Sequence, residues 1–98
     1  MKGKIKNIEW NFRADTGSLT VRGSGEMEDW GEWKERPWED FREKIRSVMI
    51  DGGITAIGDG AFRDCTALEE VQLANTVERL GVFSFRGCSA LKLSLIHI

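Results

Sequence analysis

The chain contains one eight-residue phrase twice, AFRDCTAL at residues 61–68 and SFRGCSAL at residues 84–91. The two copies are 23 residues apart, and the same offset relates other apolar positions before and after them. One unit reads I-x-x-V-x-I-x-x-x-I-x-x-I-G-x-x-A-F-x-x-C-x-x-L, with polar residues in most of the gaps. A unit of this kind cannot bury its apolar edge alone, so the repetition predicts that similar units stack on one another.

The period and the internal spacing also indicate a fold class. A period of about 20–29 residues with L-x-x-L-x-L spacing is typical of a leucine-rich repeat solenoid. The alternation at residues 71–73 predicts a short strand with its middle side chain facing outward. Residues 54–57 predict a second extended segment, which ends at Gly58, a residue able to take a positive φ.

The shared phrase itself predicts a turn that fills the space between neighbouring units. Residues 59–63 are typical of one helical turn, which would place Phe62 between the units. Cys65 and Cys88 occupy equivalent positions, and we expect them to stack as buried thiols. A disulfide or redox pair is the alternative.

The pattern I-T-x-I-G-x-x-A-F-x-x-C-x-x-L-x-x-V-x-L resembles the BspA-type leucine-rich repeat of bacterial surface proteins, and the resemblance covers residues 45–91. WNFRADTGSLTVRGSGEM at residues 10–27 and PWEDFREKI at residues 37–45 resemble the N-terminal cap of that family. The resemblance implies a secreted or cell-surface protein, some relatives of which bind host matrix proteins or promote adhesion. The chain differs from the family because it has only about two units and shows no signal peptide.

The expected architecture is a β-rich α/β solenoid, a leucine-rich repeat with an N-terminal β-hairpin and a short-helix cap. Residues 1–44 would form the cap, with a hairpin over 5–23, a loop over 24–36 and a short helix over 37–45. The helix prediction rests on an apolar stripe with helical spacing, formed by Trp38, Phe41 and Ile45. Repeats of period 23 would follow over residues 45–92.

The last residues break the pattern. The period places Ser94 at the central core position, and Leu93 and Leu95 on the solvent side. LSLIHI also resembles the translation of an adapter used in DNA library preparation, so we interpret residues 93–98 as a non-native tail. A degenerate terminal strand is the alternative. If the tail is foreign, the chain is an N-terminal fragment, and we expect self-association through an uncapped C-terminal repeat.

Composition and motifs argue against several functional classes. The net charge of −2 gives no electrostatic reason to expect nucleic-acid binding, and no apolar run is long enough to insert in a membrane. Gly-Ser-Gly at 23–25 lacks the rest of a phosphate-binding fingerprint, and the aspartates are not at calcium-loop spacing. The only histidine is His97, so no Ser-His or Cys-His pair is available within the repeats. We predict a non-enzyme without cofactor, metal or catalytic residues.

Two groups of residues are candidates for binding a ligand. The outward positions of the repeat strands form a possible binding face, made of Ser47, Met49, Glu70 and Gln72. Trp30 and Trp33 could form an aromatic platform for a sugar or a cationic ligand. The alternatives are a solvated sheet face and tryptophans that pack onto the domain. The expected function is a binding or adhesion module for an unknown protein or glycan, and the alternative is a structural spacer.

Overall fold

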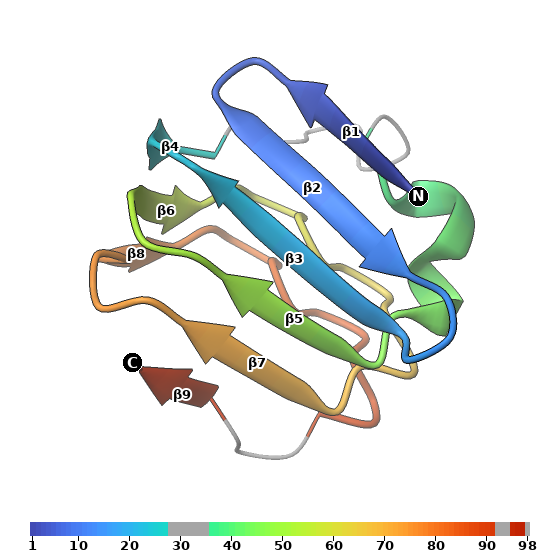
Figure 1. Cartoon of the computed structure of the whole chain (residues 1–98). Helices are drawn as coiled ribbons and strands as arrows, with labels where there is room; N and C mark the ends of the chain where they lie inside the picture. The colour runs from blue at the N-terminus through green and yellow to red at the C-terminus, as the bar shows by residue number, and fades with distance from the viewer. Residues whose placement is uncertain (28–35, 92–94, 98) are drawn as a thin grey trace.

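The computed structural model describes residues 1–27, 36–91 and 95–97 of the chain. Two sheets form its framework, as Figure 1 shows. The six-stranded sheet has the order β1 (Lys2–Ile5), β2 (Ile8–Arg13), β3 (Ser18–Gly23), β5 (Ser47–Ile50), β7 (Glu70–Leu73) and β9 (Leu95–His97). The three-stranded sheet has the order β4 (Gly25–Glu26), β6 (Ile54–Ile57) and β8 (Arg79–Leu80). The two ends of the chain lie at opposite edges of the larger sheet (Figure 1).

The N-terminal segment contributes an antiparallel meander to the larger sheet. β1 pairs with β2 and β2 pairs with β3, both antiparallel. The sequence predicted a hairpin over residues 5–23, and the structure has β2 and β3 there and adds β1 before them. The predicted loop over 24–36 also contains a strand, because β4 at Gly25–Glu26 pairs with β6 of the first repeat.

The repeats join this meander through parallel strands with a constant offset. β3 pairs with β5, and β5 pairs with β7, in parallel. Ser47 lies opposite Glu70 and Val48 opposite Val71, an offset of 70 − 47 = 23 residues that equals the sequence period. β6 and β8 are paired with the same offset, since Ala56 lies opposite Arg79. The first repeat (residues 45–67) and the second (residues 68–90) therefore lie side by side.

The register prediction for the tail is wrong by one residue. Leu95, and not Ser94, lies opposite Val71, so the offset here is 95 − 71 = 24. Residues 95–97 form β9 as a further parallel strand next to β7. The foreign origin of residues 93–98 stays a prediction.

The predicted helical turn at residues 59–63 is instead a run of single turns. Ala61 N–H donates to the Gly58 carbonyl at 3.2 Å, and Arg63 N–H donates to the Gly60 carbonyl at 3.3 Å. Left-handed residues interrupt any helix, because Gly60 has φ +68° and Asp64 has φ +60°. The second repeat has left-handed residues at the same two places, Phe83 and Gly87, with φ values of +59° and +80°.

Gly58 does not adopt the positive φ that glycine permits, and the left-handed glycine, Gly60, lies two residues later. Gly81, at the equivalent place in the second repeat, is required by the close approach of the two repeats. A Cβ added to Gly81, the equivalent of Gly58, would lie 2.5 Å from the backbone nitrogen of Asp59 and 2.6 Å from Gly58 C. Contacts this short involve backbone atoms that cannot move aside, so only glycine fits.

The core lies between the two sheets and the turns. The inward side chains of each repeat strand are buried, as the alternation predicted: Val48, Ile50, Val71 and Leu73. A column of stacked rings crosses the repeats, with centroid distances of 5.3 Å for Trp38–Phe62 and 5.5 Å for Phe62–Phe85. The aromatic side chains thus fill the space between layers.

The predicted helix over residues 37–45 is shorter and tighter in the structure. A 3₁₀ helix covers Glu39–Lys44, and Phe41 within it has non-helical backbone angles. The predicted apolar stripe is nevertheless buried, since Trp38, Phe41 and Ile45 belong to the core. Among the described residues, no helix has both the length and the apolar character needed to cross a bilayer.

Candidate functional site

The predicted binding face lies on the outward side of β5 and β7. Ser47 lies opposite Glu70, and Met49 lies opposite Gln72, so the four side chains form two adjacent rows. Met49 is 43% exposed, and the other three are partly exposed. The structure therefore brings these four residues together on one surface.

Hydrogen bonds order part of this surface. The Gln72 amide donates to the Glu70 carboxylate at 2.7 Å, and the Ser47 hydroxyl donates to the Ser18 hydroxyl at 3.1 Å. Thr16 donates to Ser18 at 3.0 Å, which continues the row of hydroxyls. The polar groups are thus held in fixed positions before any ligand arrives.

Sequence reasoning missed two members of this face, Ser18 and Thr20 of β3. The register places Ser18 beside Ser47 and Thr20 beside Met49. A small hollow is lined by residues of all three strands: Ser18, Leu19, Thr20, Ser47, Val48, Met49, Glu70 and Gln72. The signal was present in the sequence, because residues 18–21 alternate polar and apolar in the same way as the repeat strands.

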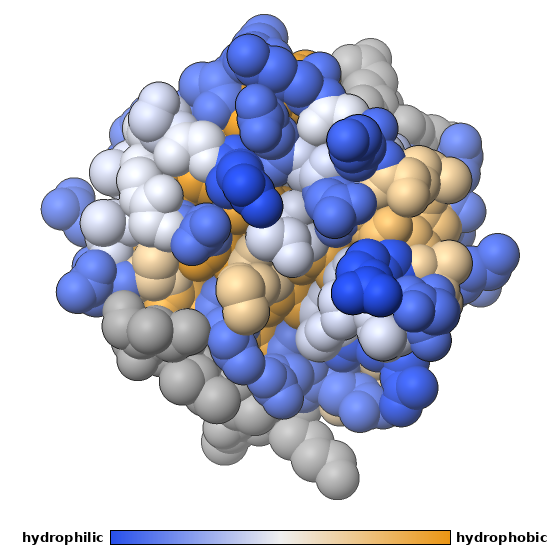
Figure 2. All heavy atoms as spheres, viewed as in Figure 1, coloured by the Kyte–Doolittle hydropathy of each residue, from blue (hydrophilic) through white to orange (hydrophobic). Residues whose placement is uncertain are grey.

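Figure 2 shows this side of the molecule in the orientation of Figure 1. Hydrophilic side chains cover most of it, with small hydrophobic areas between them. Charges of both signs lie on this face: Glu9 on β2 lies between Lys4 on β1 and Arg22 on β3, and Glu70 lies on β7. Met49 is the large exposed apolar side chain among the outward residues of β5.

The predicted aromatic platform, Trp30 and Trp33, lies outside the described residues.

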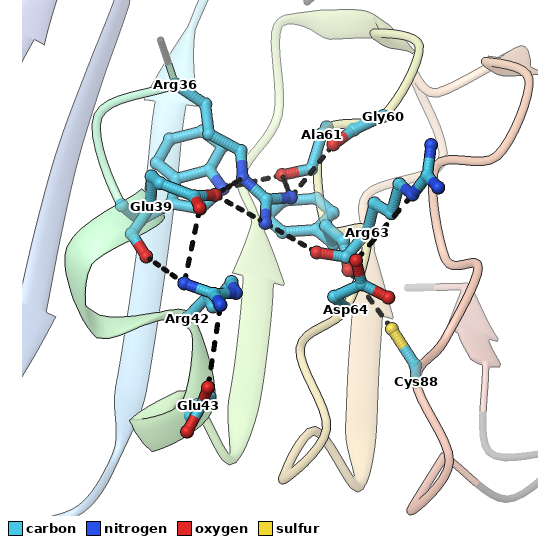
Figure 3. A network of polar contacts seen from close by, with 11 residues as sticks. Arg36, Glu39, Arg42, Glu43, Gly60, Ala61, Arg63, Asp64 and Cys88 are labelled. Carbon is cyan, nitrogen blue, oxygen red and sulfur yellow. Dashed lines mark hydrogen bonds and ion pairs between the residues drawn. The ribbon is translucent and has the colours of Figure 1, made fainter. Parts of the chain in front are cut away.

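A second polar network lies on the turn side of the molecule (Figure 3). Its centre is Arg36, which sequence reasoning placed in a loop. Only 2% of Arg36 is exposed. A lone arginine before Pro-Trp gave no signal for such burial.

Arg36 donates to the backbone of the first repeat. Its Nη1 lies 2.9 Å from both the Gly60 and the Ala61 carbonyl oxygens, and its Nη2 donates to the Arg63 carbonyl. The Glu39 carboxylate balances the charge, at 3.0 Å from the guanidinium. This buried cation is therefore both paired and hydrogen-bonded, as burial of a charge requires.

The two cysteines lie at the inner end of the same turns. Cys65 is buried and Cys88 half-buried, and both are free thiols. Burial raises the pKa of Cys65 to about 12, and burial also raises the pKa of Cys88. The Cys88 thiol donates to the Phe62 carbonyl at 3.1 Å. Thiols held in the protonated state do not act as nucleophiles at neutral pH, so these two cysteines serve as packing groups.

Among residues 1–27 and 36–91, no group of three or more His, Cys, Asp or Glu side chains is arranged to hold a metal ion. Glu69 forms an ion pair with Arg46 at 3.6 Å.

A family model described as BspA type leucine-rich repeat region (6 copies) matches residues 40–97, which is more than half of the chain. The chain belongs to the BspA-type leucine-rich repeat family. The sequence resemblance is thereby confirmed, and the match also covers the predicted tail as far as residue 97. Proteins of this BspA type are leucine-rich repeat proteins of bacteria.

Solved structures of two bacterial proteins have a similar fold. A leucine-rich repeat protein from Eubacterium ventriosum is 31% identical and superposes with a TM-score of 0.87 over 96% of this BspA-type chain. A leucine-rich cell surface protein from Faecalibacterium prausnitzii is 21% identical, with a TM-score of 0.57 over the whole chain. The chain spans 24% and 30% of these two proteins. No curated protein matches it.

Proposed function

We propose that the chain is a non-catalytic protein- or glycan-binding module, acting in adhesion, of a bacterial surface or secreted leucine-rich repeat protein, and that it forms an N-terminal part of a longer protein. The observation that carries the proposal is the continuous outer face of β3, β5 and β7. Parallel strands of like sequence repeat the same outward positions at strand spacing, which gives a broad, regular surface for a ligand.

Met49 is the centre of this face. It is a large exposed apolar side chain within a polar surround, and a flexible thioether adapts its shape to different partners. The neighbouring hydroxyls of Ser18 and Ser47, with the carboxylate of Glu70, offer donors and acceptors in fixed positions. An apolar contact surrounded by ordered polar groups is the usual composition of a protein-binding surface.

The alternative function is a structural spacer that only presents other domains. The observation in its favour is that polar groups of the face already bind each other, Gln72 to Glu70 and Ser47 to Ser18. A surface whose hydrogen bonds are satisfied internally needs no ligand.

A binding screen with the full chain separates the two functions. The immobilised chain would be exposed to a panel of matrix proteins and glycans, and every binder tested again on a Met49→Asp, Glu70→Lys double variant. We expect the double variant to lose binding, while Glu78→Lys, an exposed change outside the sheet, retains it. Binding that survives the double variant would overturn the assignment to this face, and no binder in the panel for the chain or a longer parent would favour the spacer.

We also propose that copies of the chain associate through the second repeat. Leu80, Val82 and Phe83 are 42%, 62% and 54% exposed, whereas Ile57, the equivalent of Leu80, is 1% exposed. Sedimentation at increasing protein concentration should show dimers, and Val82→Lys should shift the distribution to monomer. A monomer at all concentrations would contradict this proposal.

A further inference from the structure

One edge of the six-stranded sheet carries free backbone hydrogen-bonding groups. β1 is the edge strand (Figure 1). Met1 and Phe12 form a hydrogen-bonded pair: the Phe12 N–H donates to the Met1 carbonyl at 2.6 Å, and the Met1 amino group donates to the Phe12 carbonyl at 3.0 Å. Hydrogen-bonded and non-bonded pairs alternate along an antiparallel ladder, so Lys2 and Lys4 fall at the non-bonded places. Their N–H and C=O groups therefore point away from β2, where no described residue pairs with them.

The side chains of this edge are selective in charge. Lys2 and Lys4 are exposed and share the outward face with Asn11 and Glu9, which lie opposite them on β2. A second copy of β1 placed along the edge would bring lysines close to lysines, and exposed edge lysines are a known device against such pairing. A strand with carboxylates at alternate positions would instead set opposite charges face to face.

The inward side of the edge offers a place for an apolar side chain. Gly3 has no side chain, and the Trp10 indole occupies that space: an added Cβ would lie 2.8 Å from the indole Nε1. Trp10 is half-buried, 5.7 Å from the Phe41 ring, and its N–H has no acceptor among the described residues. The indole is therefore placed to contact a residue docked opposite Gly3.

We propose that β1 is a docking edge for an extended, acidic segment of a partner protein, which adds to the sheet as a further strand. Residues of the segment opposite Lys2 and Lys4 carry carboxylates and exchange backbone hydrogen bonds with them. The residue between them is apolar and lies opposite Gly3, against Trp10. This strand addition uses the sheet edge and does not depend on the outer face of β3, β5 and β7, so it goes beyond the proposed function.

The test uses the isotope-labelled full chain and the peptide acetyl-Thr-Glu-Val-Glu-Thr-amide, followed by nuclear magnetic resonance. We expect weak, saturable binding with shifts in the amides of β1 and in the Trp10 indole N–H. A peptide with lysines in place of both glutamates should bind at least about tenfold more weakly.

Backbone methylation distinguishes strand addition from simple charge attraction. Methylating the nitrogens of the two glutamates removes the donors that would bond Lys2 and Lys4, and we expect binding to be lost. Methylating the valine nitrogen also adds a methyl group to the backbone, but on the side of the peptide that faces away from β1. Binding of this peptide should remain. Equal affinity of the two methylated peptides would overturn the proposal.

Charge-reversed variants test the same edge from the side of the protein. The double variant Lys2→Glu, Lys4→Glu should lose the glutamate peptide and gain the lysine peptide, which also shows that the variant is folded. Lys44→Glu, an exposed change on the 3₁₀ helix, should leave the affinity unchanged. Shifts centred on Met49 and Gln72, no saturable binding, or β1 amides already protected by a second copy would each overturn the assignment.

Discussion

The first repeat has a neighbour on each side of its turns, and the two neighbours meet it with different chemistry. Toward the second repeat the contact is a backbone ladder, in which the N–H groups of Gly60, Phe62 and Asp64 donate to carbonyls of residues 82, 84 and 86. Toward the N-terminal segment, the carbonyls equivalent to two of these acceptors belong to Ala61 and Arg63. They accept from side chains: Arg36 binds both, and the Trp38 indole N–H donates to Ala61 at 2.6 Å.

The N-terminal segment uses side chains because its backbone has no donors to offer there. The positions 23 residues before the ladder donors are Pro37, Glu39 and Phe41. Proline has no N–H, and the other two N–H groups donate to the carbonyls of Arg36 and Trp38, which lie just before the 3₁₀ helix. The side-chain donors of Arg36 and Trp38 therefore end the backbone ladder at the place where a further repeat would have continued it.

The largest effect should come from the ring shared by both junctions. Phe62 is fully buried between Trp38 and Phe85, so Phe62→Ala should lower the free energy of unfolding by about 3–5 kcal/mol. Phe85→Ala, at the half-buried end of the column, should cost less than half as much. Urea unfolding measures both, and equal losses would show that the junctions do not share one core.

Trp38→Phe examines the side-chain junction alone. The ring stack on Phe62 is retained, but the indole N–H to Ala61 is lost and a small space is left. We expect a loss of about 1–2 kcal/mol in urea unfolding. No change in stability would mean that Arg36 alone satisfies the Ala61 carbonyl.

The buried thiol makes the repeat junction sensitive to alkali. The pKa of Cys65 is raised to about 12 from its usual 9, so the unfolded chain loses this proton first as the pH rises. Its stabilising effect is complete below pH 9 and should fall by about 1.4 kcal/mol per pH unit between 9 and 12. Unfolding curves of wild type and Cys65→Ala at pH 8, 9 and 10 should show a steeper loss in the wild type, because the variant keeps only the smaller contribution of Cys88, whose pKa is also raised by burial. Parallel curves would contradict the burial of this thiol.

The smallest effect compares equivalent places in the two repeats. Phe83 has a left-handed backbone where the first repeat has Gly60, and its exposed ring contacts Arg86 at 5.0 Å and Arg63 at 6.0 Å. Phe83→Gly relieves the backbone strain but loses these contacts and adds chain entropy. We expect a gain of between zero and about 1 kcal/mol. A clear loss of stability would show that the ring is part of the core.

The sequence predicted the repeated parts of the fold and failed where the chain departs from repetition. The period located Val48, Val71, Phe62 and Cys65 in the core, because each apolar position is stated more than once. Arg36 was missed because a buried arginine depends on carbonyls 24 to 27 residues away, which no local pattern reveals.

Two further differences between prediction and structure also arise from contacts between segments far apart in the sequence. The helix predicted over residues 37–45 became a shorter 3₁₀ helix, because tertiary burial of Trp38 and Phe41 decided its geometry. On the predicted binding face, the pattern found Met49 and Gln72 but not Thr20, because β3 lies outside the 23-residue period and only its own alternation indicated its outward side. The repeat pattern therefore predicts the positions that recur in each unit, and it does not predict the contacts of the N-terminal segment.

The most direct test of this account is the free energy of unfolding of Arg36→Lys, measured in urea at neutral pH beside Arg13→Lys, an exposed arginine on β2, as a surface control. A lysine keeps the charge near Glu39, but its compact ammonium cannot reproduce a planar fork that donates to three carbonyls. We predict a loss of about 2–3 kcal/mol for Arg36→Lys and less than about 0.5 kcal/mol for the control. Equal stability of Arg36→Lys and the wild type would contradict the claim that this side chain ends the ladder.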